Sequence, residues 1–268
     1  MTLHDKHKRM QAQIAALPGA VVAFSGGVDS TLVLAIAHAA LGERVLAVTG
    51  RSPSVPEREL EASKELARRI GAPHLILDTG EIHNPDYAAN PANRCYFCKT
   101  ELYDHLKRIA AERGLPYILN GTNADDLGDH RPGLVAADEA RVLSPLADAG
   151  MSKQDVRDLS QKLGLPTWDK PAMACLASRV PYGQEVTAEK LSMIERAEDI
   201  LLAMGLKQVR VRHHGDIARI EAPQDDLPML LDPEQAQVIE AKFREIGFQF
   251  VTVDILGFRS GSLNQMLR

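Results

Sequence analysis

The chain has 268 residues, of which 45% are hydrophobic and 25% charged, and its formal net charge is −5 at pH 7. This composition is ordinary for a globular protein, and the acidic balance argues against a general nucleic-acid binder, which usually has a basic face. No apolar run approaches the ~20 residues of a membrane span, and the polar residues 1–13 do not resemble a signal peptide. We therefore expect a cytoplasmic protein with neither a nucleic-acid nor a membrane partner.

Strands and helices alternate along the first 120 residues. Short apolar runs predict buried strands, and amphipathic runs that stop at Gly or Pro predict helices. In chain order we expect a helix at 2–17, a strand at 21–24, a helix at 31–41, a strand at 44–49, a helix at 56–70, a strand at 74–77, a helix at 98–113 and a strand at 117–120. This order predicts an α/β fold with a doubly wound parallel sheet, which binds ligands at the carboxyl ends of its strands.

The remaining chain predicts a second, smaller domain. Residues 79–94 and 121–150 have the composition of loops, a helix is expected at 152–163, and 165–185 shows no clear periodicity. We place the junction near Val186, which gives domains 1–185 and 186–268. For the second domain we expect an α+β layer with an antiparallel sheet, built from a helix at 188–204, strands at 208–211 and 218–221, a helix at 233–246 and a strand at 250–255.

The loop after the first strand carries the clearest chemical signal. Residues 25–30 read Ser-Gly-Gly-Val-Asp-Ser and are followed at once by a helix-patterned run. Gly26 and Gly27 allow a sharp turn close to a ligand, and the helix start together with the hydroxyls of Ser25 and Ser30 favours a phosphate or pyrophosphate. No lysine follows the glycines, so this is not the usual γ-phosphate loop, and Asp29 is placed to hold Mg²⁺ instead. The alternative is a simple helix cap at Asp29 or Ser30.

This loop resembles the signature of the PP-loop ATP pyrophosphatases, which attach AMP to a substrate oxygen and release pyrophosphate. The resemblance implies that ATP is a substrate, that Gly50, Arg51 and Ser52 meet the adenine, and that Gly121 and Thr122 line the nucleotide pocket. The alternative for Gly50 and Gly121 is that they are only turns at strand ends.

Three cysteines, Cys95, Cys98 and Cys175, fall in segments expected to be loops. Buried structural cysteines usually behave as small hydrophobes, so this distribution is unusual. Four interpretations stay open: a redox pair, an iron–sulfur cluster with one open iron, unrelated thiols of which only Cys175 reacts, or a zinc site completed by a histidine. The candidate histidines for zinc are His83, His105 and His130.

Longer motifs identify a narrower resemblance, to the LarE family. They are the strings Cys-Leu-Ala-Ser-Arg-Val-Pro-Tyr-Gly at 175–183, Arg-x-Arg-His-His at 210–214, and Asn-Gly-Thr-Asn-Ala-Asp-Asp-Leu-Gly-Asp-His-Arg-Pro-Gly at 120–133. The resemblance implies an ATP-dependent sulfur transferase that adenylates the carboxylates of pyridinium-3,5-biscarboxylic acid mononucleotide and converts them to thiocarboxylates, for the nickel-pincer nucleotide of lactate racemase. Members with only the cysteine matching Cys175 give up its own sulfur, whereas members with three cysteines hold a 4Fe-4S cluster. Cys95 and Cys98 therefore favour the cluster form, with an unknown sulfide source.

The second domain is expected to help bind this mononucleotide, the small-molecule partner. Arg210 and Arg212 alternate with valines, so both guanidinium groups lie on one strand face and suit a phosphate. The alternative is a solvated face paired with Glu221 or Asp216. Ser178 and Arg179 follow Cys175 closely and are expected to contact the substrate, or else to cap a turn.

Further acidic residues are candidates for Mg²⁺ beside Asp29. They are Asp125 and Asp126, and the pair Glu195 and Glu198, for which an exposed helix face is the simpler interpretation. We expect homo-oligomers. Rival functions are a tRNA-thiolating enzyme of the same superfamily, an amide-forming synthetase, and a binding module that senses ATP or AMP without turnover.

Overall fold

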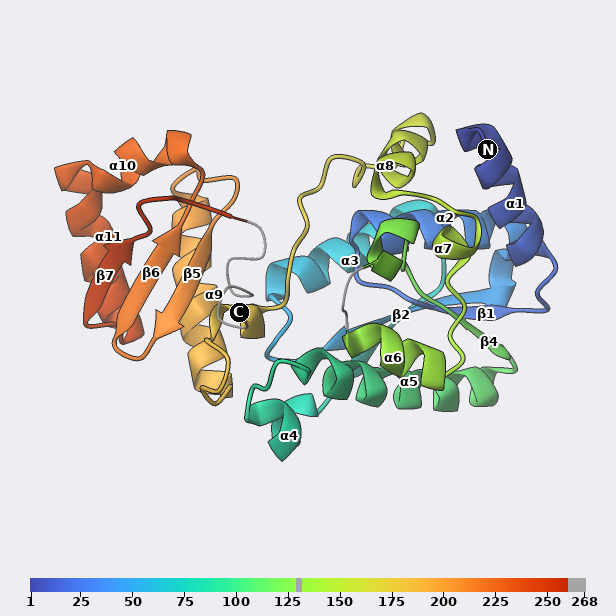
Figure 1. Ribbon diagram of the computed structural model, residues 1–268, viewed down its shortest axis with the longest axis horizontal. Coiled ribbons are helices and arrows are strands. Elements are labelled where there is room, and N and C mark those ends of the chain that lie inside the picture. The colour runs from blue at the N-terminus through green and yellow to red at the C-terminus, as the bar shows by residue number, and fades with distance from the viewer. Residues whose placement is uncertain (129–131, 260–268) are drawn as a thin grey trace. The chain divides into compact units, whose positions relative to one another are not determined.

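The computed structural model describes residues 1–128 and 132–259, and contacts within the chain group them into two compact units (Figure 1). The first unit contains residues 1–81 and 93–173. The second contains residues 82–92 together with the described chain from 174 onward. The sequence places the junction near Val186, whereas the contacts divide the chain after Met173 and assign the short segment 82–92 to the second unit.

The first unit is built on a four-stranded parallel sheet. Its strands are β1 (Ala20–Ala23), β2 (Val45–Arg51), β3 (His74–Asp78) and β4 (Tyr117–Leu119), in the order β3-β2-β1-β4. All three pairings are parallel, which confirms the expected doubly wound sheet. After β1, the chain adds β2 and then β3 on one side of β1, and it later adds β4 on the other side of β1. Strand order thus reverses between β1 and β4, and ligands bind at the carboxyl ends of strands beside such a reversal.

Helices cover both faces of this sheet. They are α1 (Leu3–Ala15), α2 (Val28–Leu41), α3 (Glu57–Ile70), α5 (Arg94–Arg113), α6 (Pro132–Glu139), α7 (Pro145–Asp148) and α8 (Lys153–Lys162). Val22 of β1 packs in the core beneath α1 and α2, and its neighbour Val21 packs in the core beneath α5 and α6, because successive strand side chains point to opposite faces. Within the described chain, no helix is both long and apolar enough to cross a membrane.

Four of the described helices lie wholly or partly where the sequence predicts loops. Helix α5 begins at Arg94 rather than at residue 98, α4 (Pro85–Ala88) interrupts the first expected loop, and α6 and α7 lie in the second. Helix α6 places Ala136 and Ala137 in the core beneath α5. Such short, alanine-rich runs have little helix signal of their own, and packing against a neighbour decides their structure.

The second unit carries a three-stranded sheet in the order β5 (Arg210–His214), β6 (Ile217–Glu221), β7 (Phe250–Val253). The pairing of β5 with β6 is antiparallel, but that of β6 with β7 is parallel, so the prediction of an antiparallel sheet is wrong. The cause is the long connection through α10 (Leu227–Leu231) and α11 (Pro233–Ile246), since a crossover of this length lets the chain enter the sheet again in the same direction. Helices α9 (Ala188–Ala203) and α11 supply Leu201 and Phe243 to the core.

The segment 82–92 is tied into the second unit by backbone and side-chain hydrogen bonds. The buried side chain of Asn90 donates to the carbonyls of Val180 and Pro181 at 3.2 and 2.7 Å. The backbone N–H of Val186 donates to Ala88 O at 2.8 Å. These contacts position the chain that follows Cys175.

Candidate active site

The loop at residues 25–30 joins β1 to α2 and leaves the start of the helix uncapped. Gly27 is the N-cap residue and has no side chain that could cap the helix, and Ser25 Oγ accepts from its backbone N–H at 3.4 Å. Gly26 has φ of +69°, a left-handed conformation that favours glycine. The hydroxyls of Ser25 and Ser30 lie 3.1 Å apart, and Ser30 Oγ accepts from Ser25 N–H at 3.2 Å, so the loop is closed on itself. The alternative of a cap by Asp29 or Ser30 is wrong, and the helix N–H groups suit an anion.

Gly121, at the end of β4, lies directly against this loop. A Cβ atom at residue 121 would lie 2.8 Å from Ser30 N and 3.1 Å from the carbonyl carbon of Asp29, closer than real Cβ contacts. The side chain of Asn120 fixes the adjacent backbone, because its Oδ1 accepts from Thr122 N–H at 3.0 Å and from the hydroxyl of Ser144 at 2.9 Å. Gly121 therefore permits the close approach of β4 to the loop and is more than a strand-end turn.

Asp29 belongs to a network that Asn123 connects. Asn123 Nδ2 donates to Asp29 Oδ1 at 3.1 Å, and its backbone N–H donates to Asp126 Oδ2 at 3.1 Å. The structure thus brings two of the predicted magnesium residues to one asparagine. The Lys153 ammonium donates to the other oxygen of Asp29, and the Lys153 backbone N–H donates to Asp125 Oδ2 at 2.8 Å. Both oxygens of Asp29 therefore accept hydrogen bonds from the protein, and the magnesium role of these carboxylates stays a prediction.

Two lysines beside the loop are missing from the sequence prediction. Lys153 lies 124 residues after Asp29 in the chain, at the first position of α8. Lys170 lies 144 residues after Gly26, donates to its carbonyl at 3.2 Å, and pairs with Glu59 at 2.7 Å. The loop has no lysine of its own, yet the fold supplies two cations from distant segments. The capping Ser152 marked the start of α8, but nothing in the local pattern indicated where Lys153 would point.

Gly50 and Arg51 end β2, and Ser52 follows the strand. Arg51 donates from Nε and a terminal nitrogen to the two oxygens of Asp78, at 2.5 and 2.8 Å, at the exposed end of the paired strands. The hydroxyl of Ser52 donates to the buried carboxylate of Glu81 at 2.6 Å. A Cβ atom at Gly50 would make only ordinary contacts. These bonds order the rim of the sheet, and the adenine role of the three residues stays a prediction.

The cysteines divide between the two units. Cys95 and Cys98 lie at the start of α5, so the prediction that they are in a loop is wrong for both. Residues three apart share one face of a helix, which suits two ligands of a common centre. Cys175 is the N-cap residue of a short 3₁₀ helix, η4 (Leu176–Arg179), in the second unit. All three are thiols, with Cys95 exposed and the other two half-buried.

The candidate zinc histidines have separate surroundings. His105 Nε2 lies 3.8 Å from Glu101, and its Nδ1 lies 2.7 Å from Arg108. His83 ends a 3₁₀ turn, and His130 lies outside the described residues. Among residues 1–128 and 132–259, no three His, Cys, Asp or Glu side chains are grouped as ligands of a metal ion.

Arg179 and Glu198 form a buried ion pair in the second unit. Arg179 Nε lies 2.8 Å from Glu198 Oε1, and the side chains are 1% and 0% exposed. A terminal nitrogen of Arg179 also donates to the carbonyls of Ala174 and Cys175, at 2.6 and 3.1 Å. Glu198 accepts in addition from the backbone N–H of Val211 at 3.1 Å. The prediction that Glu198 lies on an exposed helix face is wrong, because its side chain is fully buried, and its magnesium role stays a prediction.

Arg212 makes a second buried pair. One terminal nitrogen lies 2.8 Å from Glu221 Oε2, and the other donates to Ser178 O at 2.6 Å. The pairing with Glu221 matches the alternative drawn from the sequence, but the face is buried rather than solvated. Arg179 and Arg212 thus hold the backbone at residues 174–178 from two sides.

Arg210 differs from its two neighbours because it has no carboxylate of its own. It pairs with no acidic side chain of the described chain, and its guanidinium lies 4.5 Å from the centre of the Phe258 ring. Burial, together with the charges of Arg179 and Arg212, lowers the pKa of Arg210 to about 10. This surplus of positive charge favours an anion at Arg210.

Comparisons with known proteins agree with this geometry. A family model described as queuosine biosynthesis protein QueC matches residues 19–90, which contain the glycine loop. A pyridinium-3,5-bisthiocarboxylic acid mononucleotide synthase from Lactiplantibacillus plantarum is 37% identical, over 99% of this chain and 96% of that protein. An uncharacterized protein from Synechocystis sp. is 46% identical over 99% of both chains. The tRNA-specific 2-thiouridylase MnmA from Xanthobacter autotrophicus is 32% identical, over 56% of this chain and 48% of that protein.

The parallel sheet, the uncapped glycine loop and these matches define an ATP-dependent sulfur transferase of the PP-loop class. The match to the thiocarboxylate synthase runs along nearly the whole of both chains, whereas the match to the thiouridylase spans about half of each. The chain belongs to the LarE family, so the resemblance inferred from the sequence motifs is confirmed.

Proposed function

We propose that this enzyme adenylates the carboxylates of pyridinium-3,5-biscarboxylic acid mononucleotide and converts them to thiocarboxylates, as a step towards the nickel-pincer nucleotide of lactate racemase. The observation that supports it most is the full-length match to a pyridinium-3,5-bisthiocarboxylic acid mononucleotide synthase. The uncapped start of α2 supports the use of ATP, because a loop of this kind binds pyrophosphate.

The first half of the reaction uses the glycine loop. A carboxylate oxygen of the substrate attacks the α-phosphorus of ATP, the bond to the β-phosphate oxygen breaks, and pyrophosphate leaves. The N–H groups at the start of α2 and the ammonium groups of Lys153 and Lys170 are donors already in place for the charge on the departing group. Mg²⁺ held by Asp29 and Asp126 would neutralise phosphate oxygens, and both residues bond to Asn123, which brings them to one place.

The second half replaces AMP by sulfur. A sulfur nucleophile attacks the acyl carbon, the bond to the AMP oxygen breaks, and AMP and a thiocarboxylate are formed. The role proposed for Arg210 is to bind the phosphate of the mononucleotide, since no carboxylate among residues 1–128 and 132–259 pairs with its guanidinium. Arg179 and Arg212 would then order the segment that carries Cys175 and Ser178.

The sulfur is proposed to come from a 4Fe-4S cluster with Cys95, Cys98 and Cys175 as ligands. Such a cluster supplies a sulfide at the iron without a protein ligand. Cys95 and Cys98 fit this interpretation because they share a helix face and are thiols. The competing possibility is that Cys175 gives up its own sulfur and becomes dehydroalanine, which limits each molecule to one product.

Anaerobic purification of the three single variants Cys95→Ala, Cys98→Ala and Cys175→Ala separates these possibilities. Cluster chemistry predicts brown wild-type protein with iron and acid-labile sulfide, and loss of both in every variant. Sacrificial chemistry predicts colourless protein, sensitivity to the Cys175→Ala change alone, and loss of the mass of H₂S after reaction. Colourless protein holding one zinc ion per chain would exclude the cluster.

The substrate is tested by pyrophosphate release. With ATP and pyridinium-3,5-biscarboxylic acid mononucleotide we expect stoichiometric pyrophosphate, AMP and thiocarboxylate. With pyridine-3,5-dicarboxylic acid, which lacks the ribose phosphate, we expect much slower release of pyrophosphate because Arg210 has no phosphate to bind. Thiolation of a transfer RNA under the same conditions, with strong salt dependence, would favour the tRNA-modifying alternative instead.

A further inference from the structure

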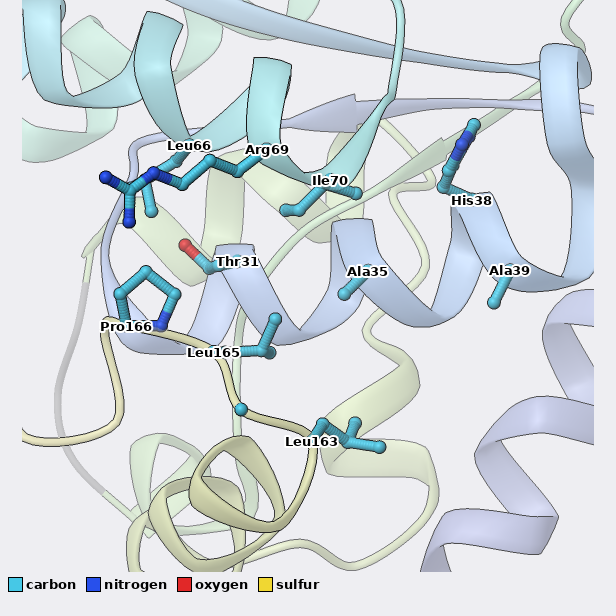
Figure 2. A pocket seen from close by; sticks show the side chains of 11 residues that line it. Thr31, Ala35, His38, Ala39, Leu66, Arg69, Ile70, Leu163, Leu165 and Pro166 are labelled. Carbon is cyan, nitrogen blue, oxygen red and sulfur yellow. The ribbon is translucent and has the colours of Figure 1, made fainter.

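A cavity of about 390 Å³ lies in the first unit on a side of α2 that the proposed reaction does not use. Figure 2 shows it between α2, the end of α3 and the chain that follows α8. Its wall is mostly apolar and is formed by Ala35, Ala39, Leu66, Ile70, Leu163 and Leu165. None of residues 25–30 lines it. A concave, largely apolar space of this size with a few polar groups is typical of a small-molecule site.

Two of the polar atoms in its lining residues have no hydrogen-bond partner in the described chain. Thr31 is 0% exposed, and its Oγ1 is one of them. In Figure 2 this hydroxyl points towards the end of the cavity near Arg69 and Pro166. The other is Nδ1 of His38, two helical turns further along α2. Because buried polar groups in proteins are nearly always hydrogen-bonded, an unpartnered hydroxyl at a cavity wall indicates that something polar binds there.

Arg69 supplies positive charge at the same end of the cavity. Its Nε donates to Glu65 Oε1 at 2.9 Å, and its terminal nitrogens bond to no other described residue. The adjacent Arg68 binds both oxygens of Glu65, so that carboxylate is shared by two arginines. The terminal N–H groups of Arg69 and the hydroxyl of Thr31 together match the donor needs of one carboxylate.

We propose that this cavity binds a small monocarboxylate with an apolar body. The carboxylate would lie at Arg69 and Thr31, and the apolar part would lie against the alanine and leucine side chains of the wall. A phosphate or a dicarboxylate fits less well, because Arg69 is the one arginine or lysine among the described residues that line the cavity. The site is separate from the pyrophosphate loop, so both can be filled together.

The test uses 3-phenylpropionate as the probe and 3-phenylpropanol as its uncharged counterpart. Protein labelled at alanine methyl groups is titrated with each, and the methyl signals of Ala35 and Ala39 are followed by NMR. We expect both signals to shift with 3-phenylpropionate in a saturable way, with at least about tenfold weaker binding of the alcohol, since a charged hydrogen bond worth ~1.4 kcal/mol corresponds to that factor. Addition of pyrophosphate should leave the probe affinity unchanged.

Matched variants locate the site. Arg69→Gln should weaken the probe at least about tenfold, and Arg68→Gln should not, although both changes remove one arginine from Glu65. Ala35→Leu should abolish binding by filling the cavity. If Ala35→Leu does not fold, the two arginine variants still decide. Equal effects of the arginine variants, no shift of the two alanine signals, or displacement of the probe by pyrophosphate would each overturn the proposal.

Discussion

The guanidinium of Arg179 donates hydrogen bonds to both carboxylate oxygens of Glu198 inside the second unit, from Nε at 2.8 Å and from a terminal nitrogen at 3.2 Å. The same guanidinium bonds to the carbonyl of Cys175. The segment that carries Cys175 is thereby fixed by a charge pair that has almost no contact with solvent. The remaining partners of Glu198 make it the point at which helix α9, strand β5 and the Cys175 segment meet.

Glu198→Gln should strongly destabilise the second unit. The change leaves the buried cation of Arg179 without its counter-charge, and breaking one member of a buried pair costs about 3–5 kcal/mol. Urea denaturation followed by circular dichroism measures the change in unfolding free energy. Glu189→Gln, at an exposed position of the same helix, is the control and should change it by less than about 0.5 kcal/mol. Equal stability of the two variants would contradict the structural role of Glu198.

Gly121→Ala should damage nucleotide binding without unfolding the protein. The new Cβ would lie 2.8 Å from Ser30 N, so either β4 or the glycine loop must move. A displacement of this kind at a phosphate site can reduce function by about tenfold to a hundredfold. Calorimetric titration with ATP measures the affinity. Gly128→Ala is the matched control, because a Cβ atom there meets no atom within 4 Å. An unchanged affinity for ATP in Gly121→Ala would show that the close approach is not needed.

Lys153→Met should slow pyrophosphate release by about a hundredfold, the usual cost of removing one donor aimed at developing charge. The substitution keeps a long side chain but removes the ammonium that bonds to Asp29. Pre-steady-state measurement of pyrophosphate gives the rate. Lys162→Met, at the exposed end of the same helix, should leave the rate unchanged. If both variants react like the wild type, Lys153 has no part in the first half-reaction.

Acid should destabilise the fold partly through His213. Burial, aided by the charge of Lys190, lowers the pKa of His213 below its ordinary value of 6.5. As pH falls through ~6.5, the unfolded chain takes up a proton that the folded state does not, so the unfolding free energy falls until the lower folded pKa is reached. His213→Phe, which keeps a ring against Phe248, should lose less stability between about pH 7.5 and about pH 5.5. An identical loss in both proteins would assign the acid sensitivity to other groups.

Local patterns were sufficient to predict the parallel sheet and the glycine loop. A short apolar run bounded by glycine or proline predicts a strand from the residues of that segment alone. The glycine loop lies between a strand and a helix that are adjacent in the chain, so its prediction needs no distant residue. The helix at Pro132–Glu139 and the early start of α5 were missed, because tertiary packing rather than local periodicity makes them helical. The parallel pairing of β7 could not be predicted either, since it depends on how the crossover through α11 is arranged.

Among the charged residues of the site, too, some could be predicted from the local sequence and others depend on the fold. Asp29 was predicted from its place in the loop, but Lys153 and Lys170 come from segments more than a hundred residues away. An exposed helix face was the simpler interpretation for Glu198 and a solvated strand face was the alternative for Arg212, because charged side chains are seldom fully buried unless paired. The pairing of Arg212 with Glu221 was an alternative drawn from the sequence, but only the fold shows that Arg179 pairs with Glu198 and that both pairs are buried.

The hydrogen bonds from Asn90 to the carbonyls of Val180 and Pro181 have a consequence for folding during translation. The bonded residues are 90 and 91 positions apart, and the segment around Asn90 belongs to the later unit. At the speed of a ribosome, that separation is roughly 5 to 20 s of translation. During this interval the nascent segment waits without its partner while the chain on both sides of it completes the parallel sheet. A fragment that starts at Ala174 would lack this piece, so expression of the later unit by itself should yield an unstable product.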